Sequence, residues 1–246
     1  MTDPCYLAEL GAPSVGDVVQ VAGEEGRHAA VVKRTRVGEV VLVADGRGRA
    51  IRGPVTEVGK QGISVQVDEC LTSAPAAHRW TAVQALAKGD RSDIAVESLT
   101  ELGATRIIAW QAARSVVRWD EAGKADKGVA KWQATAREST KQSRRFVVPE
   151  VSYASTERLA AVLGGADLAL VAHEDADRPL AGVALPATGE VVIVVGPEGG
   201  ISPEELARFT AAGAQLVSLG DGVLRTSTAG IVALAQLQAL VVLAGL

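Results

Sequence analysis

The chain has 246 residues, of which 48% are hydrophobic, 22% are charged and only 3% are aromatic, and its formal net charge is −4. A chain of this composition can bury a hydrophobic core, so disorder along most of its length is excluded. The scarcity of aromatic residues argues against an aromatic-lined sugar site. The two cysteines, Cys5 and Cys70, match no metal-ligand spacing, which excludes a zinc ribbon or a disulfide scaffold, and no metal site is expected.

The charges are distributed unevenly along the chain. Residues 27–52 contain seven Lys or Arg and two Asp or Glu, residues 106–145 contain ten and four, and residues 146–221 contain three and eleven. Two basic stretches in an acidic chain are typical of a protein that binds nucleic acid. Two solvated faces without a partner remain the alternative at this point. The N-terminus has no basic segment followed by an apolar one, so no signal peptide is predicted and a cytoplasmic protein is expected.

Residues 1–72 predict β structure. Short Val-rich runs recur between turn clusters, a pattern typical of a small barrel or sandwich. The expected strands are 17–21, 39–43 and 63–67, and residues 24–33 are expected to form one helix. Residues 71–77, rich in small residues and proline, form the expected linker.

After the linker, strands and helices alternate, which predicts a parallel sheet covered by helices on both faces. The expected strands are 79–85, 106–109, 168–172, 191–195 and 215–219, and the expected helices are 91–102, 124–142, 156–163, 203–212 and 227–246. Residues 229–246 carry no charge and have the length of a membrane span. Because Gln236 and Gln238 interrupt them and no basic flank follows, a core or dimer-interface helix is favoured.

The sharpest local signal is a glycine-rich turn after the buried run 191–195, with the sequence Gly196-Pro197-Glu198-Gly199-Gly200-Ile201-Ser202. Ser202 is expected to cap the next helix, with Glu205 completing a capping box. Ligands of α/β sheets bind beyond the carboxyl ends of strands, where glycines allow close backbone approach. The turn has neither a G-x-G-x-x-G pattern nor a Walker A lysine, so it does not favour a dinucleotide or a nucleoside triphosphate. A tight structural loop is the alternative.

A second polar turn, 220–228, precedes the last helix. It contains two glycines and a run of hydroxyl side chains, and its Arg225 is the only charged residue between Asp221 and the C-terminus. A lone charge in so apolar a context is costly unless it is paired or used. The two turns together predict the rim of a ligand pocket.

Residues 196–202 and 219–226 resemble the RsmE family, SPOUT-superfamily methyltransferases that act on N3 of a uridine in 16S ribosomal RNA. The resemblance continues at Lys88-Gly89-Asp90-Arg91, at Glu101-Leu102-Gly103-Ala104, at 137–149 and at 28–36 with Asp45-Gly46, so it covers nearly the whole chain. It implies an α/β fold in two domains. Residues 1–72 would form a PUA-like, RNA-binding β-barrel, and residues 73–246 a SPOUT methyltransferase domain with a parallel sheet and a C-terminal trefoil knot, a feature that is rare in proteins.

The resemblance also implies the partners. S-adenosylmethionine (SAM) is the expected cofactor, 16S ribosomal RNA within the small subunit is the expected substrate, and the protein is expected to be a homodimer without a membrane association. The residues expected to bind SAM are Ala172, His173, Gly196, Pro197, Glu198, Gly199, Leu219, Gly220, Val223, Leu224, Thr228 and Ala229. The residues expected to bind RNA are Arg27, Lys33, Arg34, Arg36, Arg47, Arg137, Lys141, Arg144 and Arg145.

Arg225 is the expected catalytic residue, as a cationic donor to the uracil carbonyl oxygens. Glu198 is expected either to meet the sulfonium or ribose of SAM or to cap the following helix. The family commonly has Arg where this chain has Gly222 and Glu where it has Ser227. These departures leave two alternatives open: an RNA-binding ribosome-assembly factor that keeps the fold without turnover, and a SPOUT methyltransferase that acts on another RNA, such as transfer RNA.

Overall fold

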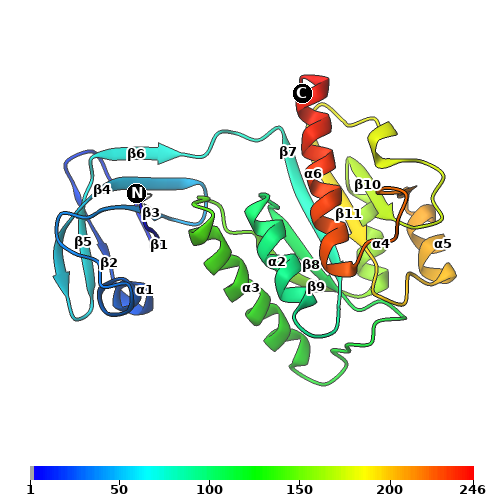
Figure 1. The fold of residues 1–246 in the computed structure, drawn as a ribbon, viewed down its shortest axis with the longest axis horizontal. Coiled ribbons are helices and arrows are strands. Elements are labelled where there is room, and N and C mark those ends of the chain that lie inside the picture. The colour runs from blue at the N-terminus through cyan, green and yellow to red at the C-terminus, as the bar shows by residue number, and fades with distance from the viewer. Residues whose placement is uncertain (1–2) are drawn as a thin grey trace. The chain divides into compact units, whose positions relative to one another are not determined.

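The computed structural model describes residues 3–246, which form two compact units (Figure 1). The first unit contains the residues up to Pro75 together with Arg137–Val148, and the second contains Ala76–Ala136 and Pro149–Leu246. The predicted ranges assign residues 137–148 to the second domain. In the structure their backbone is bonded to the first unit, because the Gly48 N–H donates to the Phe146 carbonyl and the Val148 N–H donates to the Gly46 carbonyl, both at 2.9 Å.

The first unit is built on one six-stranded sheet. Its strands are β1 (Cys5–Leu7), β2 (Val18–Val21), β3 (Val40–Ala44), β4 (Arg49–Gly59), β5 (Gly62–Gln66) and β6 (Glu69–Thr72). The order is β1-β3-β4-β5-β2, β6 pairs with β4, and every pairing is antiparallel except that of β1 with β3. Buried and more exposed residues alternate along β2 and β5, so one side of each strand faces a core that includes Tyr6, Val41, Ile51 and Val65.

Two features of the first unit differ from the sequence prediction. The single helix expected at 24–33 is instead α1 (Gly23–Arg27) followed by a π-helical turn, His28–Val32, in which the Lys33 N–H bonds to the His28 carbonyl at 2.9 Å. The strands β1, β4 and β6 were not predicted. Gly53 and Pro54 interrupt the hydrophobic pattern of β4, and the Gln66 carbonyl occupies the space that a side chain at Gly53 would need.

The second unit is a six-stranded parallel sheet in the order β12-β10-β11-β7-β8-β9. The strands are β7 (His78–Ala85), β8 (Arg106–Trp110), β9 (Glu150–Ala154), β10 (Leu168–Ala172), β11 (Gly189–Val195) and β12 (Gln215–Val217). The central strands β7 and β11 are buried along most of their length, as expected for strands covered on both faces. The predicted α/β class is confirmed. The trefoil knot stays a prediction.

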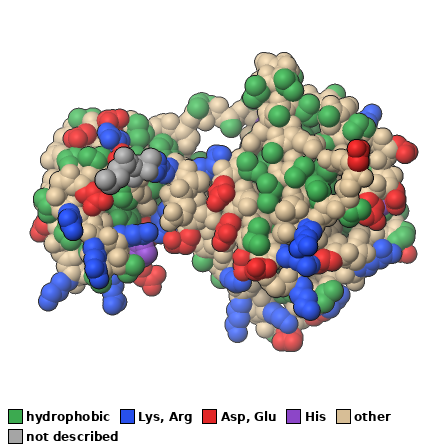
Figure 2. Space-filling view, in the orientation of Figure 1, with side chains coloured by type: hydrophobic (Ala, Val, Ile, Leu, Met, Phe, Trp, Pro, Cys, Tyr) green, Lys and Arg blue, Asp and Glu red, His purple; other side chains and the backbone are tan. Residues whose placement is uncertain are grey.

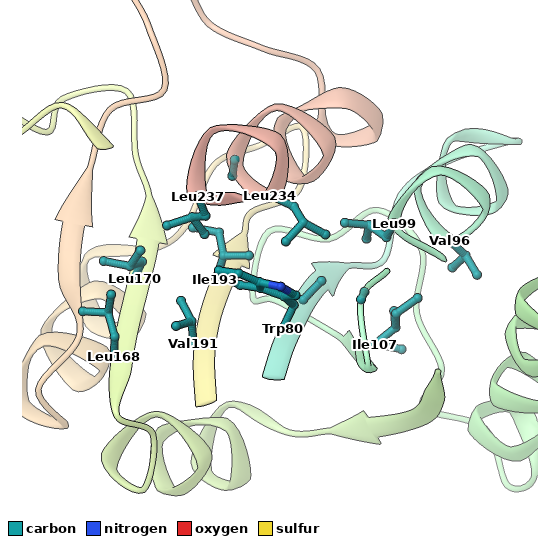
Figure 3. Close-up of a cluster of buried hydrophobic side chains, with 14 of the residues drawn as sticks. Trp80, Val96, Leu99, Ile107, Leu168, Leu170, Val191, Ile193, Leu234 and Leu237 are labelled. Atoms are coloured by element: carbon teal, nitrogen blue, oxygen red, sulfur yellow. The ribbon is translucent and has the colours of Figure 1, made fainter. Parts of the chain in front are cut away.

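Helices cover both faces of this parallel sheet (Figure 1). They are α2 (Arg91–Glu101), α3 (Lys124–Gln142), α4 (Thr156–Gly164), α5 (Pro203–Ala211) and α6 (Thr226–Ala244), with a 3-10 turn at Leu180–Gly182. On one face, Leu99 of α2 and Leu234 of α6 pack with Trp80 of β7, as Figure 3 shows. On the other face, Leu159 of α4 and Phe209 of α5 pack with residues of the same strands.

The last helix, α6, is long and apolar enough to cross a membrane by length and composition alone. Within the structure, 33% of its most apolar 18-residue segment is buried. Ala233, Leu234 and Leu237 lie in the core of the second unit. Val242 and Leu243, near its C-terminal end, are 80% and 83% exposed. The helix therefore has one buried side and an apolar end that the described chain leaves uncovered.

Candidate active site

A pocket of about 750 Å³ lies at the carboxyl ends of three neighbouring parallel strands, β10, β11 and β12. The loops that follow these strands supply most of its wall, as the general rule for ligand sites in α/β sheets predicts. All of the residues expected to bind the cofactor line the pocket except Thr228. The Thr228 hydroxyl instead donates to the Arg225 carbonyl at 3.1 Å, within the first turn of α6.

The glycine-rich turn after β11 brings bare backbone to the pocket wall. A Cβ atom at Gly196 would lie 2.7 Å from Cγ1 of Ile201, and one at Gly199 would lie 3.1 Å from Cβ of Arg114. Gly200 has φ +73°, a conformation that favours glycine. A side chain at Gly196 or Gly199 would press against its neighbours, and one at Gly200 would strain the backbone, so the main chain itself forms this part of the pocket.

The capping box predicted at the start of α5 is confirmed. The Ser202 hydroxyl accepts from the Glu205 N–H at 3.2 Å, and the Glu205 carboxylate accepts from the Ser202 N–H at 3.0 Å. Glu205 is 5% exposed, and its Oε1 also accepts from the Ala113 N–H at 2.8 Å and the Thr156 hydroxyl at 3.3 Å. This buried carboxylate joins α5 to the loop after β8, a connection that the sequence did not indicate.

Glu198 lies on the pocket wall, but it does not cap α5, because Ser202 and Glu205 perform that role. Its Oε1 accepts from Nη1 of Arg91 at 2.7 Å and from the Lys88 N–H at 3.3 Å. Burial alone raises the pKa of Glu198, but hydrogen bonds from its own backbone N–H, Arg91 and Lys88 outweigh burial and hold the pKa below its ordinary value. The charged carboxylate therefore ties the glycine-rich turn to the start of α2.

Arg225 lines the pocket as the residue that immediately precedes α6. The sequence analysis placed Arg225 in an apolar context where its charge would be costly. In the structure this cost does not arise, because Arg225 is exposed on the rim where the turn meets the helix. Within residues 3–246 the guanidinium of Arg225 forms no ion pair. Neither Asp221 nor Glu198 pairs with it, and Glu198 pairs with Arg91 instead. A purely structural ion pair was the alternative to a catalytic role, and this geometry does not support it.

Two other arginines, Arg91 and Arg114, also line the pocket and were missed by the sequence analysis. Arg91 begins α2 after β7, and Arg114 follows the carboxyl end of β8. The rule that located the glycine-rich turns, which looks beyond the carboxyl ends of parallel strands, would have found both. His173 stands on the wall after β10, where its Nδ1 accepts from the Asp175 N–H at 3.2 Å.

The residues expected to bind RNA all belong to the first unit, although they come from two separate stretches of sequence. Lys33 and Arg144, one from each stretch, line the same smaller pocket of about 260 Å³. We define the basic set as the exposed cations Arg27, Lys33, Arg34, Arg36, Arg47, Arg137, Arg144 and Arg145. Figure 2 shows Lys and Arg side chains on the visible surface of the first unit.

Lys141 differs from this basic set because its side chain is only 7% exposed. Its Nζ donates to Glu25 at 3.0 Å and to Glu138 at 2.7 Å. Burial lowers the pKa of Lys141, but its hydrogen bonds to Glu138 and Glu25 outweigh burial and raise the pKa above its ordinary value. With two carboxylates already on its ammonium group, Lys141 is placed to stabilise the first unit and not to contact a phosphate.

Comparison with known proteins finds RNA methyltransferases along most of the chain. Residues 74–238 match the model of an RNA methyltransferase domain, and residues 21–68 match that of an RNA methyltransferase PUA domain. Ribosomal RNA small subunit methyltransferase E from Mycobacterium bovis is 44% identical over 227 residues, which cover 90% of this chain and 86% of that protein. The protein of the same name from Bacillus subtilis is 31% identical over 94% of each chain.

Among solved structures, ribosomal RNA small subunit methyltransferase E from Neisseria gonorrhoeae bound to S-adenosyl methionine superposes with a TM-score of 0.85. It is 28% identical, and the match covers 97% of this chain and 98% of that one.

Proposed function

This chain belongs to the RsmE family of ribosomal RNA small subunit methyltransferases, and we propose that it methylates N3 of one uridine in 16S ribosomal RNA. SAM is the methyl donor. The observation that carries the proposal is the pocket at the carboxyl ends of β10, β11 and β12, which gathers from separate loops all of the predicted cofactor residues except Thr228.

The wall of the pocket fits SAM by its chemistry. At Gly196 and Gly199 a side chain would press against Ile201 and Arg114, so this part of the wall is main chain, whose N–H and C=O groups can meet the polar edge of an adenine. We assign SAM binding to the predicted residues that line the pocket. When bound, SAM would supply the electrophilic methyl group on its positively charged sulfur. Transfer would break the S–CH₃ bond and form the bond to N3 of the uracil, so that S-adenosylhomocysteine leaves and the N3 proton passes to solvent.

Arg225 is the proposed catalytic residue. Loss of the N3 proton leaves negative charge shared between N3 and the two flanking carbonyl oxygens of the uracil. An arginine on the pocket rim without an ion-pair partner in the described chain can donate to one of these oxygens as the charge develops. No activated protein nucleophile is needed, and burial with the nearby Glu25 raises the pKa of the Cys5 thiol to about 11, which keeps it protonated.

We assign RNA binding to the basic set of the first unit. Its members are exposed, and Lys33 and Arg144 border the same pocket, so the two basic stretches can hold one RNA backbone. The target uridine has to leave any base stack to enter the active site, as bases do in other enzymes that modify them. We place this reaction in the cytoplasm.

We propose that the functional form is a homodimer in which a second copy of the chain covers the apolar end of α6. Val242 and Leu243 are strongly exposed there, and Val223 on the pocket rim is 76% exposed. Exposed apolar groups of this kind favour a protein partner. Sedimentation of the pure protein without detergent should give twice the mass of the chain; a stable monomer, or a requirement for detergent, contradicts the proposal.

The activity is tested by mapping modified nucleotides in ribosomal RNA. A strain without the gene should lack one N3-methyluridine in 16S ribosomal RNA, and restoring the gene should restore it. Restoration by the Arg225→Ala variant should fail although the protein accumulates normally. An unchanged 16S pattern, or a lost modification in transfer RNA, would contradict the assigned substrate.

A further inference from the structure

The loop that follows β8 places a third arginine-bearing segment at the active-site pocket. β8 ends at Trp110, and Arg114 stands four residues later on the pocket wall. Of the arginines that line this pocket, the proposed function uses only Arg225, which comes from the turn before α6. Arg114 therefore reaches the same pocket from a different part of the sheet, beyond the carboxyl end of another strand.

The backbone on the N-terminal side of Arg114 is held firmly. The Ala113 N–H donates to the buried Glu205 carboxylate at 2.8 Å, and the Ala112 N–H donates to the Ser115 hydroxyl at 3.2 Å. Ala112 and Ser115 are both buried. Because Glu205 also caps α5, the position of Arg114 is fixed relative to the glycine-rich turn that leads into this helix.

The side chain of Arg114 runs against that turn. Its Nη1 donates to the Gly199 carbonyl at 3.2 Å, and a Cβ at Gly199 would lie 3.1 Å from the Arg114 Cβ. This is the only hydrogen bond that the structure gives the Arg114 side chain within residues 3–246. A guanidinium has five N–H donors in a fixed, planar arrangement, so most of them remain available to a ligand in the pocket.

The chemistry of the substrate calls for a second donor. When a uracil loses its N3 proton, the negative charge spreads to both carbonyl oxygens, which stand on opposite sides of N3. One arginine on one loop can donate to one of these oxygens. We infer that Arg114 donates to the carbonyl oxygen that Arg225 does not reach, so that the two arginines together bind the deprotonated uracil. This inference rests on the proposed function.

The test compares three variants of the full-length protein. Arg114→Gln removes the charge, Arg114→Lys keeps it, and Arg118→Gln changes an exposed arginine of the same loop that lies outside the pocket. Thermal unfolding of all three should stay within about 2 °C of the parent, because these side chains are exposed. SAM affinity measured by calorimetry should stay within about threefold of the parent in every variant.

At saturating RNA, the single-turnover rate of Arg114→Gln should fall about 10²-fold, as it does when one donor to a developing anion is removed. Arg114→Lys should recover part of this loss, and Arg118→Gln should match the parent. A binding measurement supplies an independent readout. The parent should bind an RNA fragment with 6-azauridine at the target position, whose N3 proton is more acidic, more tightly than the unmodified fragment, and Arg114→Gln should lose this preference.

Each other result overturns the inference in an identifiable way. Weakened SAM binding by Arg114→Gln would show that Arg114 only supports the Gly199 backbone. A raised KM for RNA with an unchanged kcat would make it a phosphate contact. An unaltered Arg114→Gln, with a normal parent, would remove it from the reaction. A parent without methyl transfer to N3 would overturn this inference together with the proposed function.

Discussion

The two units differ in which residues adopt a left-handed backbone conformation. In the active-site pocket, the left-handed position at φ +73° is occupied by Gly200, which adopts it without steric cost. In the first unit, Arg34 and Arg144 adopt φ values of 54° and 53°, and within residues 3–246 they are the only residues other than glycine with positive φ. A left-handed conformation costs such a residue about 1–2 kcal/mol.

This difference agrees with the roles that we propose for the two regions. The pocket presents main chain, so the smallest residue is favoured and strain is avoided. The basic set presents charged side chains, and two of its arginines have the left-handed conformation that glycine adopts at least cost. Both arginines directly follow a helix end, where the next N–H bonds back to the helix (Thr35 to the Ala29 carbonyl, Arg145 to the Thr140 carbonyl), so the left-handed conformation closes a helix C-terminus.

The largest expected effect concerns Arg225, because its side chain is proposed to act in a pocket that otherwise presents main chain. Arg225→Ala should lower the single-turnover rate of methyl transfer by about 10²–10³-fold, because a donor to the developing anion is lost. The variant should stay folded and bind SAM within about threefold of the parent, since the proposed cofactor contacts come from backbone. Arg208→Ala, at an exposed position of α5 outside the pocket, is the control. A preserved rate would show that Arg225 takes no part in the reaction.

Replacing Gly199 with Val tests the backbone side of the contrast. The new Cβ would lie 3.1 Å from Cβ of Arg114 and 3.2 Å from its carbonyl oxygen, and the added methyl groups would force the turn to shift. Overpacking of this kind costs about 1–3 kcal/mol, so calorimetry should show SAM affinity weakened about tenfold or more. Gly182→Val is the control, because a Cβ there meets only Pro179 at an ordinary 3.8 Å. Equal affinities in both variants would place SAM away from this turn.

Removing the helix cap tests how the backbone of the pocket is held. Ser202→Ala deletes the hydroxyl that accepts from the Glu205 N–H, and the free energy of unfolding should fall by about 1 kcal/mol. Ser155, which caps α4 in the same way, lies outside the pocket, so Ser155→Ala should cost a similar amount of stability. SAM affinity should weaken only in Ser202→Ala. A loss of affinity in both variants would mean that general stability, and not the local cap, controls the pocket.

The smallest expected effect is that of replacing Arg34 or Arg144 with glycine, which should raise stability and weaken RNA binding. Arg34→Gly and Arg144→Gly should each raise the free energy of unfolding by about 0.5 kcal/mol, because relief of the left-handed strain exceeds the entropy cost of glycine. Each should also lower the log–log salt slope of RNA binding by about 0.7–0.9 for the lost phosphate contact. Arg36→Gly, at a position with ordinary φ, should lower both stability and slope. Stability gains without any change in slope would identify the two arginines as strained but unused.

Patterns along the chain allowed much of the second unit to be predicted. The buried run 191–195, the glycine-rich turn and the capping box are local features, because each depends on residues within a few positions of one another. The strand β4 was missed because Pro54 and Gly53 break its pattern, and their place in a strand depends on the neighbouring chain.

Contacts between distant segments could not be predicted. In the sequence, Lys141 is one of several cations in a basic helix and was expected to bind RNA. Only the fold brings Glu25 to its ammonium group. Likewise, the role of Glu205 as a bond acceptor for the loop after β8 depends on how α5 packs beside that loop. Charge and periodicity describe what a residue is able to do, whereas the partners of a buried charge are set by tertiary structure.

The union of residues 137–148 with the first unit has a consequence for how this protein can be divided. The backbone groups of Gly46 and Gly48 form hydrogen bonds with those of Val148 and Phe146, and Glu25 forms an ion pair with Lys141. A gene fragment that stops at residue 75 would encode a module whose β3–β4 turn has lost these bonds and whose Glu25 carboxylate has lost its cation. Recombination could not exchange this module as one contiguous block, because part of it is encoded within the sequence of the other unit. A graft of the first unit onto another protein therefore has to carry both of its segments.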